Sequence, residues 1–133
     1  MDMAEELIKY EDKVKRLLIT NQQSSKTIFK VGPRTVKVTS SSIVINGKGV
    51  IQMDGIPKLY DSGSAINSTW DITIPIDSIV NMYHESFKAE CAMHYHKKAV
   101  GIDAKIDEVL MSYAIFTHKP LDLFQIIQNS RPQ

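Results

Sequence analysis

The stretch TIFKVGPRTVKVTSSSIVINGKGVIQM, residues 27–53, decides the fold, because its apolar residues recur with a period of two. Such alternation is typical of a β-strand with one buried face. Gly32-Pro33-Arg34 separates β-type runs at 27–31 and 35–39, and these residue types predict a turn. This part of the chain is therefore predicted to form short antiparallel strands.

A second turn is predicted at NGKG, residues 46–49. It lies between β-type runs at 42–45 and 50–53, and Asn-Gly supplies the positive φ angles of a tight hairpin turn. Residues 54–69 are rich in glycine and serine and are predicted to form the longest loop.

Further strands are predicted on the C-terminal side of this loop. Residues 70–76 place Trp70, Ile72 and Ile74 on one face, and Pro75, which has no amide donor, predicts an edge position. Residues 109–117 fit a strand or a helix, and their β-branched and aromatic content favours a strand. The other predicted strands are 79–84, 87–96 and 100–106.

The N-terminal residues 1–20 instead show helical spacing, with charged residues between the apolar ones. Leu7, Val14 and Leu17 lie on one seam. This seam predicts either a helix laid across the domain's own core or one that pairs with a second copy of the chain. Residues 21–26 form a polar linker.

Pro120 marks the start of a predicted C-terminal helix at 119–129. With a β-rich body at 27–118, the chain of 133 residues is predicted to be a single domain, 1–133, of the mainly β (α+β) class. The expected architecture is a small antiparallel barrel or sandwich with an N-terminal amphipathic helix and a closing C-terminal helix. This layout resembles that of pleckstrin-homology-like modules, and the resemblance is one of layout only, without a shared motif.

Composition excludes several classes of protein. A net charge of +1 argues against a general binder of nucleic acids. No apolar run is long enough to span a membrane, and the N-terminus lacks the apolar core of a secretory signal. The single cysteine, Cys91, fits a reducing compartment. We therefore expect a cytoplasmic protein, in a bacterium or in a host cell.

His94 and His96 are the first candidate site residues, in the sequence FKAECAMHYHKK at 87–98. On a strand they share a face with Glu90, and two imidazoles with a carboxylate could bind zinc or act as acid and base. Cys91 would point to the opposite face. The simpler interpretation is that both histidines lie on the solvated face of the strand, and we predict no metal and no cofactor.

The second candidate site is basic. Residues 26–58 contain six basic residues and one acidic residue, an asymmetry that can attract an anionic ligand. Arg34 lies at the predicted Gly-Pro turn, Lys30 and Lys37 lie on the flanking strands, and Tyr60 lies in the predicted loop at 54–69. The alternative interpretation is that these lysines keep the strand edges soluble.

Nucleotide-binding and hydrolase motifs are absent from the sequence. We therefore expect a non-catalytic binding module, such as a small viral or bacterial accessory protein, that binds a protein partner or a small anionic ligand and forms a homo-oligomer. The alternatives are a small hydrolase or lyase that uses His94 and His96, or a weak nucleic-acid binder that uses the basic region.

Overall fold

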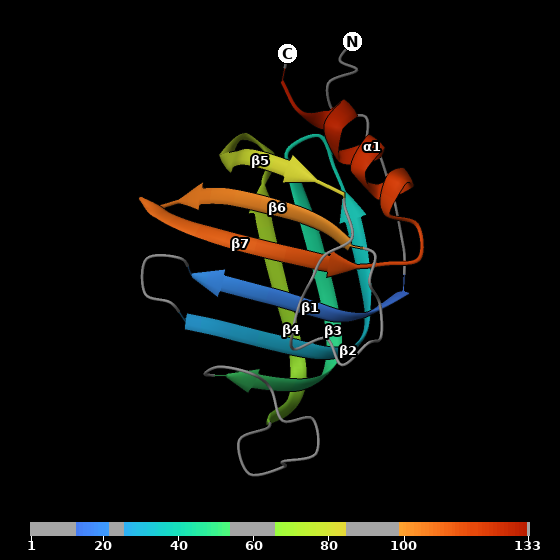
Figure 1. Ribbon diagram of the computed structural model, residues 1–133. Helices are drawn as coiled ribbons and strands as arrows, with labels where there is room; N and C mark the ends of the chain where they lie inside the picture. Colours follow the sequence, from blue (N-terminus) through green and yellow to red (C-terminus); the bar gives the residue numbers. More distant parts are fainter. Residues whose placement is uncertain (1–12, 22–25, 54–65, 85–98, 133) are drawn as a thin grey trace.

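The computed structural model describes residues 13–21, 26–53, 66–84 and 99–132, which form one seven-stranded antiparallel sheet and a C-terminal helix (Figure 1). The strand order is β4-β3-β2-β1-β7-β6-β5. The elements are β1 (Lys13–Asn21), β2 (Lys26–Val38), β3 (Ser42–Met53), β4 (Ile66–Pro75), the 3₁₀ turn η3 (Ile76–Ser78), β5 (Ile79–Tyr83), β6 (Ala99–Ile106), β7 (Val109–Phe116) and α1 (Pro120–Ser130).

The sheet is folded over on itself into two layers. In Figure 1, β2 runs beside β1 and then curves behind it, so that much of β3 and β4 lies behind β1, β7 and β6. The edge strands β4 and β5 are joined by η3, whose Ile76 N–H donates a hydrogen bond to the carbonyl oxygen of Ser41 at 2.9 Å. Among the described residues β4 and β5 do not pair, so the predicted alternative of a closed barrel is not formed.

The core lies between the two layers and is built mainly from β-branched side chains. One row of fully buried residues, Leu17, Val100 and Ile115, crosses three adjacent strands. Helix α1 contacts β6 and β2 and buries Leu123 and Ile127 against the core. The predicted C-terminal helix is thereby confirmed, with Pro120 in its first turn, where the missing amide donor costs no hydrogen bond.

The two predicted turns at glycine are wrong. Gly32-Pro33-Arg34 lies inside β2, and Asn46-Gly47 lies inside β3. The β1–β2 register shifts between Val14 and Arg16, opposite Val31 and Arg34, and Gly49 has a φ of 145°. A bulge and a positive φ both bend a strand. We infer that the sheet bends at these residues, where it passes from one layer to the other.

The real β2–β3 turn contains no glycine. The Thr39 N–H donates to the carbonyl oxygen of Ser42 at 2.8 Å, and the Thr39 hydroxyl oxygen accepts from the N–H groups of Ser41 and Ser42 at 3.2 and 3.0 Å. The threonine side chain thus satisfies turn amides that face no partner strand, as hydroxyl residues do in turns of this kind.

The predicted N-terminal helix is wrong over residues 13–20, which lie in β1; this strand pairs with β2 and, from Arg16 onward, also with β7. Leu17 is fully buried in the core, so it does not have the exposure that a seam between two helices requires. Residues 1–12, with Leu7, lie outside the described part of the chain. The apolar residues of this segment recur at spacings of four and three, which predicted a helix. The segment forms a strand because cross-strand pairing outweighs local periodicity.

Other strand predictions are confirmed. Residues 109–116 form β7 rather than a helix, and the strands at 70–76, 79–84 and 100–106 appear as β4, β5 and β6. Pro75 ends the edge strand β4, where its missing amide breaks no ladder. The strand predicted at 87–96 lies outside the described residues, as do residues 54–65 of the predicted loop.

The β6–β7 turn consists of Asp107 and Glu108, whose φ angles are 52° and 65°. A two-residue turn with both φ angles positive is type I′, and a non-glycine residue is strained there.

We expect Glu108→Gly to raise the free energy of unfolding by up to about 1 kcal/mol, measured by urea unfolding. Lys105→Met is the control, because it removes only the exposed Lys105–Glu108 ion pair at 3.6 Å. A loss of stability in Glu108→Gly larger than in the control would contradict the strain.

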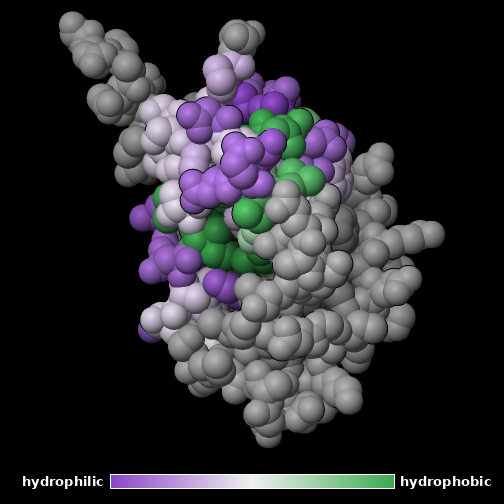
Figure 2. Space-filling model, turned by 90° about the vertical axis from the view of Figure 1, so that its left-hand side faces the viewer, coloured by the Kyte–Doolittle hydropathy of each residue, from purple (hydrophilic) through white to green (hydrophobic). Residues whose placement is uncertain are grey.

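One side of the molecule carries an apolar band bordered by hydrophilic residues (Figure 2). Ile106 and Met111, beside the β6–β7 turn, are partly buried against the core. Among the described residues, the exposed large apolar side chains are Val80 and Leu121. No helix within the described residues is long and apolar enough to cross a membrane.

Candidate functional site

Trp70 belongs to the core and packs closely against Gly47 of β3. It pairs across the strands with Gly47, which in turn pairs with Arg34 of β2. A Cβ atom on Gly47 would lie only 2.4 Å from the Cη2 atom of Trp70. Glycine is therefore required at position 47 so that the indole can cross over β3, and this packing leaves Trp70 only 5% exposed.

Two cations lie over the indole ring. The Lys30 Nζ atom is 5.0 Å from the Trp70 ring centroid, and the Arg34 Cζ atom is 5.3 Å from it. Arg34 is 2% exposed and donates a hydrogen bond from Nη2 to the carbonyl oxygen of Lys30 at 2.8 Å. We call Lys30, Arg34 and Trp70 the cationic cluster. Each cation–π contact of this kind contributes roughly 0.5–2 kcal/mol.

Burial in the cationic cluster makes the charged form of Lys30 less favourable than it is in water. Burial lowers the pKa of Lys30, and the positive charge of Arg34 lowers it further, while the negative charge of Asp71 opposes both effects. The shift means that the site disfavours the charged ammonium relative to water. A further negative charge beside Lys30 would oppose this effect.

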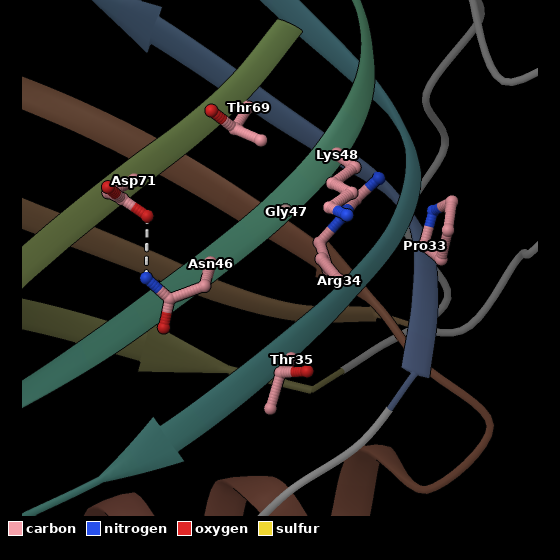
Figure 3. Close-up of a pocket in the computed structure, with 8 residues that line it drawn as sticks. All are labelled: Pro33, Arg34, Thr35, Asn46, Gly47, Lys48, Thr69 and Asp71. Carbon is pink, nitrogen blue, oxygen red and sulfur yellow. Dashed lines mark hydrogen bonds between the residues drawn. The ribbon is translucent and has the colours of Figure 1, made fainter.

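A shallow groove lies on the face of these strands opposite Trp70, because Asn46 and Asp71 alternate with Gly47 and Trp70 along β3 and β4 (Figure 3). Asn46 and Asp71 point toward each other across β3 and β4, and the Asn46 Nδ2 atom donates a hydrogen bond to Asp71 Oδ1 at 2.6 Å. Lys48 is an exposed cation at the groove. The groove has a volume of about 430 Å³ and is lined by Pro33, Arg34, Thr35, Asn46, Gly47, Lys48, Thr69 and Asp71.

The structure brings together two of the predicted ligand-binding residues, Lys30 and Arg34, and leaves a third apart. Lys37 is exposed, and the alternation along β2 places it on the face opposite the buried Val36 and Val38. The fourth residue, Tyr60, lies outside the described part of the chain. The basic residues of 26–58 therefore divide between the two faces of the sheet.

The histidine site cannot be placed, since His94, His96 and Glu90 lie outside the described residues. His84 packs edge-on against Phe124, with ring centroids 4.6 Å apart, and His118 is exposed. Within residues 13–21, 26–53, 66–84 and 99–132, no three histidine, cysteine, aspartate or glutamate side chains gather as a metal site requires.

Comparisons with known proteins assign neither a family nor a fold relative. No protein-family model matches the chain, and neither a curated protein nor a solved structure matches it significantly. The functional proposal therefore rests on the geometry of the cationic cluster.

Proposed function

We propose that the protein is a non-catalytic binding module that holds a small anionic ligand at the cationic cluster. The observation that carries this proposal is the placement of two cations, Lys30 and Arg34, over one buried indole ring. Two like charges that share one site disfavour each other's charged form. A bound anion would offset this effect.

The surroundings of the cluster also favour a small ligand over a polyanion. A nucleic acid needs basic residues on one continuous surface, whereas Lys30 and Arg34 contact Trp70 and Lys37 is exposed on the other face of the strand. The two-layered sheet with α1 across one end supports the resemblance in layout to pleckstrin-homology-like modules, and that resemblance assigns no ligand.

Fluorescence titration tests the proposal, because Trp70 is the protein's single tryptophan. We expect inorganic phosphate, added at constant ionic strength, to change the Trp70 emission in a saturable way. Lys30→Met should weaken phosphate binding about 10- to 100-fold, the usual effect of losing a hydrogen bond to a charged group.

The matched control is Lys105→Met, which makes the same change of charge on β6, at an exposed position. This variant should bind phosphate as the wild type does. Equal weakening in both variants, or an emission that follows total salt without saturating, would show that no anion site exists at the cluster.

A further inference from the structure

Trp70 carries a buried hydrogen-bond donor that the fold does not use. The indole Nε1 atom is inaccessible to solvent and has no acceptor among the described residues. The large majority of buried side-chain polar atoms have a hydrogen-bond partner, because leaving such an atom unsatisfied destabilises the fold. This donor therefore points to an acceptor that the described part of the chain does not supply.

The donor edge of the indole is the edge that crosses β3. The atoms nearest a Cβ position on Gly47 are Cη2, Cζ2 and Cε2, the last at 2.9 Å, and Cε2 is bonded to Nε1. The N–H group thus lies over β3, which is paired with β2 on the side of Arg34. Donor and cations are parts of one compact cluster.

We propose that the Trp70 Nε1–H group donates a hydrogen bond to an oxygen atom of the bound anion, and that the ligand is an oxyanion of the phosphate or carboxylate class. This inference rests on the proposed function and adds a direct contact to it. Lys30 and Arg34 supply positive charge, while the indole supplies one directed donor, so the site selects for an acceptor oxygen as well as for charge.

The packing of Trp70 holds this donor in place before the ligand arrives. The ring is fixed between Gly47 on one side and the cations on its face, so little side-chain entropy remains to be lost on binding. A preorganised donor of this kind adds affinity mainly by lowering the cost of binding.

Nuclear magnetic resonance of the ¹⁵N-labelled wild-type protein tests the contact, since one tryptophan gives one indole N–H signal. We expect this signal to move downfield and saturate with inorganic phosphate or with acetate, and to stay in place with chloride at equal ionic strength. A response to phosphate alone or to acetate alone would identify the oxyanion class. If neither causes any saturable shift in the spectrum, the inference and the proposed function both fail.

Calorimetry of Trp70→Phe separates the two proposals. Phenylalanine keeps an aromatic face for the cations and lacks the N–H donor, so we expect about 10- to 100-fold weaker binding of the oxyanion that shifts the indole signal. Binding that saturates without moving the indole signal, or that is unchanged in Trp70→Phe, would overturn the indole contact and leave the anion site intact. The wild-type titration decides this point even if the variant does not fold.

Discussion

Replacing Leu17 with alanine is expected to lower the free energy of unfolding by about 2–5 kcal/mol. Leu17 is fully buried in β1, opposite Ile115 of β7, which in turn lies opposite Val100 of β6. Truncation would leave a cavity in the middle of the sheet, where neighbouring side chains held by three strands cannot move in to fill it. Urea unfolding, monitored by circular dichroism, measures the change.

Leu17→Ala also tests whether Leu17 acts as a core residue or as part of the predicted seam between two copies of the chain. A core residue affects stability equally at all protein concentrations, whereas a seam residue affects it through association. Leu121→Ala is the control, because Leu121 is 63% exposed and its loss should cost no more than about 0.5 kcal/mol. Destabilisation by Leu17→Ala that vanishes on dilution, together with a change in sedimentation, would support the seam instead.

Gly47→Val is expected to destabilise the protein by about 1–3 kcal/mol and to displace the indole. A Cβ atom would lie 2.4 Å from Cη2 and 2.5 Å from Cζ2 of Trp70, closer than carbon atoms can approach. Because Trp70 is buried, the ring cannot move without breaking its contacts with Lys30 and Arg34. The emission of Trp70 should shift to longer wavelength as the ring reaches water, and phosphate binding should be lost with it.

Gly101→Val provides a matched comparison. A Cβ atom there would meet the Tyr83 ring even more closely, at 2.0 Å, yet Tyr83 is only partly buried on the edge strand β5. This ring can turn toward solvent, so we expect a smaller loss of stability and no change in phosphate binding. Equal effects of the two substitutions would show that the position of Trp70 does not matter to the site.

The period of two was sufficient to predict most of the antiparallel strands, but β1 was predicted as a helix and the turns of β2 and β3 were misplaced. Glycine and proline mark any unusual backbone geometry, and at Gly32-Pro33 and Gly49 that geometry is a bend within a long strand. Gly47 is required by the approach of Trp70, a contact between residues far apart in the chain. Nothing local to Asn46-Gly47 distinguishes this requirement from a hairpin turn.

The candidate site was predictable in part. Charge counting identified Lys30 and Arg34, and alternation placed Trp70 with the apolar residues Ile72 and Ile74. The role of the indole depends on register, because only the pairing of Arg34 with Gly47 and of Gly47 with Trp70 brings the ring beneath the cations. A single sequence does not specify that register.

The pairing of β1 with β7 has a consequence for synthesis on the ribosome. The hairpins from β2 to β4 can form from neighbouring segments as the chain emerges, but β1 obtains its second partner only after β7 has left the exit tunnel. Until then one edge of β1 is open to pairing with another nascent chain. A strand that closes the sheet so late favours slow folding after release, and it makes the newly made chain a natural substrate for chaperones.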